Sequence, residues 1–191
     1  MGILRTDRVS GLGGANAIKG SVEFRAAQNI QAEIVNSNAD FNYGSGDFTI
    51  ECWIYETTTN TDRSVWDGRN APYPSDSNGF TLTRISSNAF RIWLGSALIT
   101  TGSVTIQNSW VHTAFVRYSG TINLFINGIS AGTASNSSNF SSSADFRIGA
   151  GRYTGTSADA FITGYIQDFR ITSGLARYTT NFTPPTASFE G

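Results

Sequence analysis

The sequence predicts an all-β fold in which two antiparallel sheets pack face to face as a jelly-roll sandwich. Apolar and polar residues alternate with a period of two in several short stretches, as they do in half-buried strands. Clusters of Gly, Asn and Ser bound these stretches, as turns between strands require. No stretch has a sustained 3.6-residue apolar repeat, so we expect very little helix.

The chain is predicted to begin with an arm over residues 1–20, followed by one jelly-roll domain over residues 21–191. The arm is rich in glycine and small residues and has no sustained period, so we expect it to become ordered by lying on a neighbouring surface. Its larger side chains are expected to make the assembly contacts: Leu4, Arg5, Arg8, Val9 and Leu12.

A long strand is predicted over residues 48–55. Its two faces consist of Phe48, Ile50, Cys52 and Ile54 on one side, and Thr49, Glu51, Trp53 and Tyr55 on the other. Shorter strands are predicted from the alternations Phe80/Leu82, Phe90/Ile92/Leu94, Ile122/Leu124/Ile126 and Phe146/Ile148. The pairs Ser119-Gly120 and Asn127-Gly128 predict two tight hairpin turns, and therefore a three-stranded meander. After the last long strand we expect one helical turn at 173–178, and Pro184-Pro185 ends regular structure.

Composition excludes several classes of partner. Only 14% of the residues are charged, the net charge is −1, and the arginines are scattered singly. Nucleic acid and anionic membranes both require clustered positive charge, so neither is an expected partner. Cys52 is the single cysteine, so it forms no intrachain disulfide, and its place in an apolar strand predicts a buried thiol. We find no signal-peptide core and no apolar run of the ~20 residues that span a bilayer.

Four blocks resemble, in the same order, the strands of laminin G-like (concanavalin A-like) domains: 39–54, 110–117, 124–128 and 164–171. The ending, Ala176-Arg177-Tyr178 followed by Asn181 to Pro185, is similar to a subgroup found in tailed-bacteriophage virion proteins of the tail, fibre or capsid surface. This resemblance implies a non-catalytic virion structural protein, with other virion proteins as partners. A symmetric homo-oligomer is natural for such proteins.

Some concanavalin A-like folds are glucanases, and retaining glycosidases need two carboxylates about 5–5.5 Å apart. Glu51 and Glu56 are the nearest pair of glutamates, but their odd spacing puts them on opposite faces of a strand. His112 is the only histidine and is expected to be packed as a structural residue. We therefore expect no catalytic residues and no enzyme activity.

Calcium is the one cofactor that the resemblance brings into question, because laminin G-like and pentraxin-like relatives bind it through loop carboxylates. The candidate ligands are Asp67, Asp76 and Asp159, but they form no dense acidic cluster and are typical of solvated turns. Residues 24–28 also replace an Asp-Gly turn that relatives usually have. No cofactor is therefore expected.

Two groups of residues are candidate ligand contacts. The first is the loop 66–74, which holds Trp66, Asp67, Arg69, Asn70 and Tyr73 and is stiffened by two prolines. The second consists of Trp53 and Tyr55 on one strand and Arg91 and Trp93 on another, which would form one aromatic platform if those strands were neighbours. Aromatic faces and planar polar groups suit saccharides, so a module that binds host surface polysaccharide is the alternative function. The structural alternative is that these aromatics cover a sheet edge or pack under the other sheet or the arm.

Overall fold

The computed structural model describes residues 21–34, 42–58, 61–70, 79–94, 96–140, 145–152, 158–187 and 189. The predicted assembly arm, with Leu4, Arg5, Arg8, Val9 and Leu12, lies outside the described residues. Tyr73 and Asp76 lie outside them as well.

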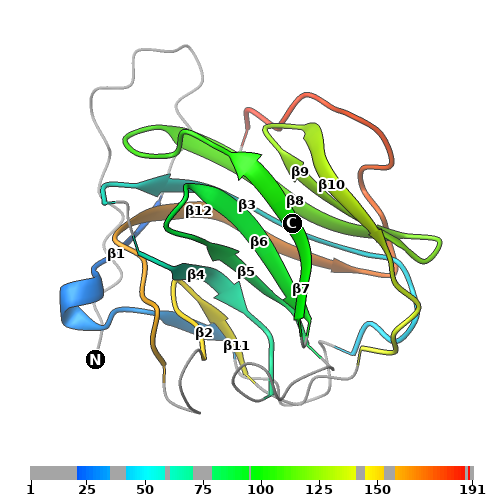
Figure 1. The fold of residues 1–191 in the computed structure, drawn as a ribbon, viewed down its shortest axis with the longest axis horizontal. Coiled ribbons are helices and arrows are strands. Elements are labelled where there is room, and N and C mark those ends of the chain that lie inside the picture. The colour runs from blue at the N-terminus through cyan, green and yellow to red at the C-terminus, as the bar shows by residue number, and fades with distance from the viewer. Residues whose placement is uncertain are drawn as a thin grey trace.

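The described residues form two antiparallel sheets of six strands each, which confirms the predicted jelly-roll sandwich (Figure 1). Sheet A consists, in spatial order, of β1 (Val22–Phe24), β12 (Gly164–Ser173), β3 (Phe48–Glu56), β8 (Trp110–Tyr118), β9 (Thr121–Ile126) and β10 (Ile129–Ser135). Sheet B consists of β2 (Ala32–Ile34), β11 (Phe146–Ile148), β4 (Arg63–Asp67), β5 (Thr81–Arg84), β6 (Ala89–Leu94) and β7 (Ser96–Ser103).

The core lies between the two sheets and follows the predicted alternation. On β3 the apolar face from Phe48 to Ile54 is buried, and Cys52 is fully buried among these residues, as expected for a free thiol. Phe48, Phe80 and Phe115 pack with ring centroids 4.7–5.7 Å apart and join the two layers. The side chains that point away from this core therefore line two outer faces, one on each sheet.

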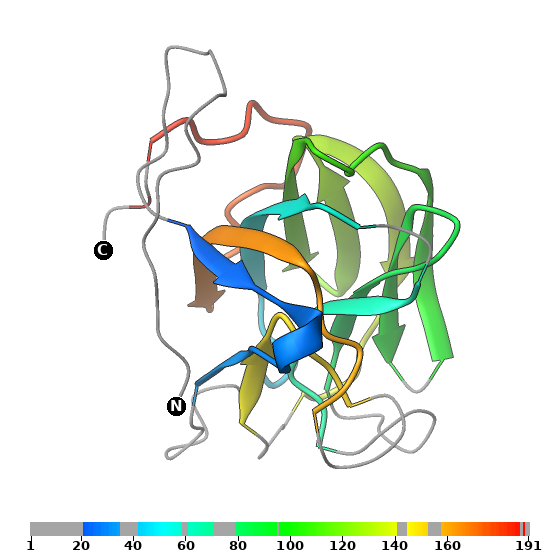
Figure 2. The same ribbon diagram turned by 90° about the vertical axis from the view of Figure 1, so that its left-hand side faces the viewer.

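Both predicted hairpin turns are present. Asn127 and Gly128 have φ of 50° and 77°, and Ser119 and Gly120 have φ of 46° and 76°, the left-handed values that a type I′ turn needs at both central positions. Gly128 is also required by packing, because a Cβ atom there would lie 1.9 Å from the carbonyl oxygen of Phe182. The described chain contains no α-helix, and its one helical element is a 3-10 turn at Ala26–Gln28, which Figure 2 shows beside β1. No helix among the described residues is long and apolar enough to cross a bilayer.

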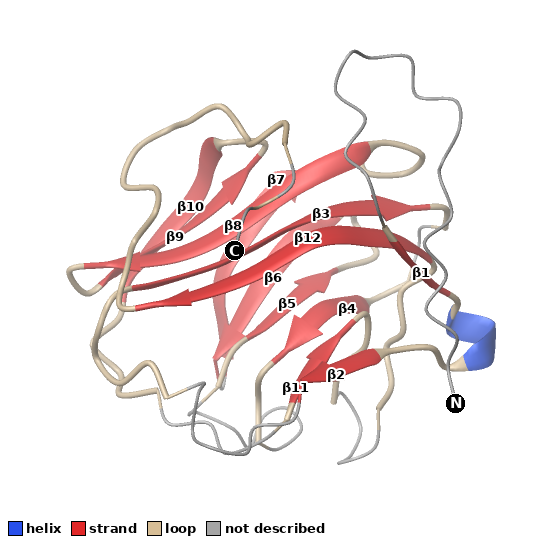
Figure 3. Ribbon diagram, turned by 180° about the vertical axis from the view of Figure 1, so that it is seen from behind, coloured by secondary structure: helices blue, strands red, loops and turns tan. Residues whose placement is uncertain are grey.

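The helical turn expected at 173–178 is absent, so that prediction is wrong. β12 continues to Ser173, and Gly174, with φ of 76°, turns the chain into an extended segment over residues 174–187, which we name the C-terminal strap. Figure 3 shows the strap in tan, leaving the end of β12 and returning over sheet A. Its residues Ala176, Tyr178 and Phe182 pack on the outer face of sheet A, and these tertiary contacts override the weak local helix signal.

Candidate functional site

The outer face of sheet B displays an arginine and a tryptophan side by side. On β6, Phe90 and Ile92 point into the core and are fully buried, so Arg91 and Trp93 point outward, where both remain half-buried. The Arg91 guanidinium carbon lies 5.0 Å from the centre of the Trp93 ring. The Arg91 Nε donates a hydrogen bond of 3.2 Å to Thr100 Oγ1 on β7, which fixes the guanidinium over the indole. The pair thus combines a broad apolar ring with a planar cation.

Two threonines on β5 lie beside this pair. Thr81 lies opposite Trp93 and Thr83 opposite Arg91 in the ladder between β5 and β6. Both are on the outer face of the sheet and yet only 1% and 3% exposed, so neighbouring groups cover them. The Thr81 hydroxyl donates to the Trp66 carbonyl at 2.8 Å. We name the set Arg91, Trp93, Thr81, Thr83 and Thr100 the Arg91–Trp93 site.

The neighbouring strand β4 contributes a closed ion cluster. Asp67 lies opposite Thr81 and is fully buried. Its carboxylate accepts hydrogen bonds from the Arg69 backbone N–H, Nε and Nη2 at 2.9, 3.0 and 2.7 Å, and from the Arg152 backbone N–H at 2.7 Å. Burial lowers the pKa of Arg152, while the charge of Asp67 opposes that shift.

The prediction that Asp67 and Arg69 contact a ligand is therefore wrong. The Asp67 carboxylate already accepts four hydrogen bonds from Arg69 and Arg152, and Arg69 is only 3% exposed. The same saturation removes Asp67 as a calcium ligand. Asp159 takes part in an antiparallel bridge with Gly151 through the backbone. In the described part of the chain, no three His, Cys, Asp or Glu side chains are grouped in a way that could hold a metal ion.

Trp66, the other predicted contact in this loop, belongs to the core. Its side chain is fully buried, stacks on Phe146 with ring centroids 5.6 Å apart, and lies 5.8 Å from the ring of Phe115. The alternation along β4 puts Trp66 on the inner face, so its prediction as a ligand contact is wrong. Asn70 is half-buried at the end of the described part of this loop.

The sequence belongs to a recognised family. The family model Laminin_G_3, described as the concanavalin A-like lectin/glucanases superfamily, matches residues 27–176. The chain belongs to this superfamily. No curated protein matches the sequence.

Solved structures share the fold of this concanavalin A-like domain. One is a Bacteroides ovatus protein provisionally named a carbohydrate binding protein, with a TM-score of 0.63 and 15% identity over 82% of this chain. Another is the CBM40 module of the Ruminococcus gnavus IT-sialidase bound to α2,3 sialyllactose, with a TM-score of 0.61 and 13% identity over 83% of this chain and 93% of that one. A third is the heptameric SAP-like pentraxin of Limulus polyphemus, with a TM-score of 0.55 and 13% identity over 82% of this chain and 77% of that one.

These identities are low, so the likeness establishes the fold and not the ligand. The chain spans 43% of the Bacteroides ovatus protein and 26% of the NanB sialidase of Streptococcus pneumoniae, a further similar structure. The similar structures include carbohydrate-binding modules, and some belong to larger sialidases.

The condition for one aromatic platform, that the two strands be neighbours, is not met. β3 belongs to sheet A and β6 to sheet B, so Trp53 and Tyr55 lie on the opposite side of the molecule from Arg91 and Trp93. Arg91 and Trp93 on β6 lie between β5 and β7, whereas Trp53 and Tyr55 on β3 lie between β12 and β8. Sequence reasoning missed the threonines of the Arg91–Trp93 site, although the strand register of β5, β6 and β7 would have placed them there.

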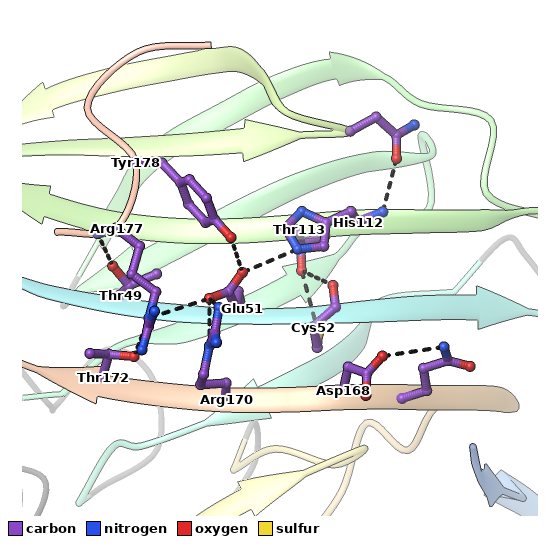
Figure 4. Close-up of polar contacts among 12 residues, drawn as sticks. Thr49, Glu51, Cys52, His112, Thr113, Asp168, Arg170, Thr172, Arg177 and Tyr178 are labelled. Carbon is purple, nitrogen blue, oxygen red and sulfur yellow. Dashed lines mark hydrogen bonds and ion pairs between the residues drawn. The ribbon is translucent and has the colours of Figure 1, made fainter. Parts of the chain in front are cut away.

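Glu51 is the centre of a buried polar network on the outer face of sheet A (Figure 4). Its carboxylate accepts hydrogen bonds from Arg170 Nε and Nη2 at 2.9 and 2.7 Å and from the Tyr178 hydroxyl at 2.8 Å. His112 Nε2 lies 3.3 Å from it, and His112 is fully buried, as predicted. Burial alone would raise the pKa of Glu51, but these hydrogen bonds outweigh it and hold the pKa below its usual value.

This network joins the strap to the sheet, because Tyr178 belongs to the strap while Arg170 is on β12. A bulge between Gln167 and Arg170 breaks the alternation of β12, and Arg170 forms its ion pair with Glu51. Glu56, on the opposite face of β3, forms a buried ion pair with Arg84. Both glutamates are thus held by structural arginines.

Proposed function

We propose that this chain is a non-catalytic carbohydrate-binding domain that holds a glycan at the Arg91–Trp93 site. The observation on which the proposal depends is the guanidinium of Arg91 held over an outward-facing indole, 5.0 Å from the centre of its ring. Saccharides present apolar C–H faces that pack on aromatic rings, together with hydroxyls that need polar partners. The site supplies both kinds of contact.

The charge of the site favours one class of sugar. Arg91 offers a planar cationic donor group, and its Nε donates to Thr100. Guanidinium groups pair well with carboxylates through two parallel hydrogen bonds. We therefore propose a glycan that contains acidic sugars, such as a surface polysaccharide of a host cell. The presence of carbohydrate-binding modules among the similar structures supports this class of ligand.

The arrangement of the glutamates supports a role in binding without catalysis. A glycosidase needs two carboxylates that face one sugar bond. In this domain Glu51 is tied to Arg170 and Tyr178 on the outer face of β3, whereas Glu56 is paired with Arg84 on the other face.

A glycan-binding screen tests the proposal. Wild-type protein is run in affinity gels that contain acidic or neutral polysaccharides, and Trp93→Ala is compared with Tyr118→Ala. Tyr118 is 52% exposed on the outer face of sheet A and serves as the matched control. We expect an acidic polysaccharide to retard wild type and Tyr118→Ala but not Trp93→Ala. Equal retardation of the two variants would exclude the Arg91–Trp93 site.

We also propose that the domain is a structural protein of a tailed-bacteriophage virion. In this role residues 1–20 would assemble it, as a homo-oligomer, onto capsid or tail proteins. The support is the resemblance of the strap sequence, from Ala176 to Pro185, to the ends of such proteins. Immunogold labelling of purified particles should place the protein on the virion, and deletion of residues 2–20 should abolish its incorporation. Unlabelled particles, or normal incorporation of the truncated protein, would reject this role or the role of the arm.

A further inference from the structure

The C-terminal strap folds back onto sheet A through a single glycine. β12 ends at Ser173, Gly174 has φ of 76°, and the carbonyl of Leu175 already accepts a hydrogen bond of 3.0 Å from the Thr49 hydroxyl on β3. The hinge is therefore one residue in a left-handed conformation that glycine adopts readily. Apart from its chain neighbours, no described atom lies within 4 Å of the position that a Cβ atom would take on Gly174. The hinge thus has room to change its conformation.

The strap packs on a small apolar cluster that is separate from the main core between the sheets. The members of this cluster on sheet A, which we name the seat, are Ala114, Val116 and Phe125. From the strap, the rings of Tyr178 and Phe182 stack on each other with centroids 3.6 Å apart and 5° between their planes, so they form one apolar unit. Because the main core does not include the seat, the strap can leave sheet A without opening that core.

Polar contacts fix the position of the strap along the seat. The Tyr178 hydroxyl donates to Glu51 on β3 at 2.8 Å (Figure 4), and the Ser130 backbone N–H on β10 donates to Asn181 Oδ1 at 2.9 Å. Each of these contacts joins the strap to sheet A and none of them involves the hinge. The strap of a second copy of the chain is identical, so it can make the same contacts with the same fit.

Two exposed apolar side chains lie at the corner of sheet A where the strap begins. Tyr118 is 52% exposed and Leu175 is 50% exposed. The residues next to them are both bound to Asp47, whose carbonyl accepts the Gly174 N–H at 2.8 Å and whose carboxylate accepts the Ser119 N–H at 2.9 Å. We name this place the hinge corner. Large apolar side chains that are exposed together are typical of surfaces that contact another protein.

We propose that two copies of the chain exchange their straps, so that each strap lies on the seat of the other copy. An extended residue spans at most about 3.6 Å, so a one-residue hinge brings the two copies together at their hinge corners. This contact covers Tyr118 and Leu175, which a single copy leaves exposed. Short hinges favour such exchange, and the product is a closed, symmetric dimer. The exchange uses neither residues 1–20 nor the Arg91–Trp93 site.

Sedimentation equilibrium of the full chain, refolded from urea at high protein concentration, tests for the dimer. Gly174→Ala should strengthen it, because alanine is strained at φ of 76° and an extended hinge relieves that strain. Each hinge should contribute about a fivefold effect and a dimer has two, so the association constant should rise about 25-fold. Gly102→Ala is the matched control, at an open position without positive φ, and should leave the constant unchanged. Leu175→Ser should lower the constant several-fold, because it removes apolar surface from the hinge corner.

Cross-linking between two different chains tests whether the dimer forms by exchange. One chain carries Asn181→Cys on the strap and the other carries Ser130→Cys on β10, two exposed positions that a hydrogen bond joins in the structure. The two proteins are mixed, unfolded, refolded together and treated with a short bis-maleimide, while the native Cys52 is buried. We expect covalent pairs that contain one chain of each kind. Asn181→Cys mixed with Ser87→Cys, in an exposed turn of sheet B, is the control and should give none.

The proposal is overturned if wild type and Gly174→Ala are both monomers at the highest soluble concentration. It is also overturned if a dimer forms but the strap pair cross-links no better than the control pair. An oligomer built by residues 1–20 keeps each strap on its own seat and gives that second result, so the test separates exchange from assembly through the arm. Circular dichroism shows whether each variant is folded. If Gly174→Ala does not fold, wild type and the cross-linking pair decide the question.

Discussion

Replacing Glu51 by Gln should destabilise the domain strongly, because Glu51 links the strap, β12 and β8 through one buried carboxylate. The change keeps the shape of the side chain and removes its charge. Arg170, which now donates two hydrogen bonds to Glu51, would be left facing a neutral amide at 20% side-chain exposure. Tyr178 can still donate to the amide oxygen.

The magnitude follows from the burial of both partners. Glu51 is fully buried, and breaking one partner of a buried ion pair typically costs about 3–5 kcal/mol. We place Glu51→Gln at about 3 kcal/mol, the lower end of that range, because Arg170 keeps some contact with water. Tyr178→Phe removes a single hydrogen bond to a charged group and should cost about 1.5–3 kcal/mol.

Urea unfolding followed by tryptophan fluorescence measures these free energies. Limited proteolysis of the folded protein then reports whether the strap alone is released. Thr172→Ser, on the same outer face, is the control and should change the unfolding free energy little. A loss below about 1 kcal/mol for Glu51→Gln would refute the reasoning, since that is the size expected for a solvent-exposed pair.

Three further predictions concern other parts of the domain. Because hydrogen bonds hold the pKa of Glu51 below its ordinary value of 4.5, the stabilisation is complete above that value and is lost as the pH falls through the folded-state pKa. Melting temperatures from pH 7 to pH 3 should therefore fall less for Glu51→Gln than for wild type. Trp66→Ala should cost about 3–5 kcal/mol in urea unfolding, and a cost near zero would contradict its core position. Asp67→Asn should cost a similar amount, about 3–5 kcal/mol, because it leaves the buried charge of Arg69 without its carboxylate partner, and an unchanged unfolding midpoint would contradict this.

The strands and hairpins could be predicted because their signals are local. Alternation from Phe48 to Tyr55 specifies both faces of β3 without knowledge of its neighbours. The pair Asn127-Gly128 specifies its own turn, because few residues adopt positive φ. The four blocks that resemble this superfamily predicted the family of the fold, and the family match over residues 27–176 confirms that family.

The site residues could not be predicted because their positions depend on which strands are neighbours. Trp53 and Arg91 have the same local pattern, outward residues on alternating strands, but the topology places them on different sheets. Trp66 and Asp67 follow one another on β4, so one must face the core and the other the outer face. The prediction of a loop over 66–74 does not include this alternation. The bulge in β12 likewise separates Asp168 from Arg170, and no local signal announced it.

The most direct test of the proposed function is a calorimetric titration of wild type and Trp93→Ala with the acidic polysaccharide selected by the affinity gels. Trp93 contributes the indole on which the proposed sugar packs, so its removal should raise the dissociation constant about tenfold or more, with an unchanged melting temperature. Equal affinities for wild type and Trp93→Ala, or no measurable heat with any acidic polysaccharide, would contradict the account.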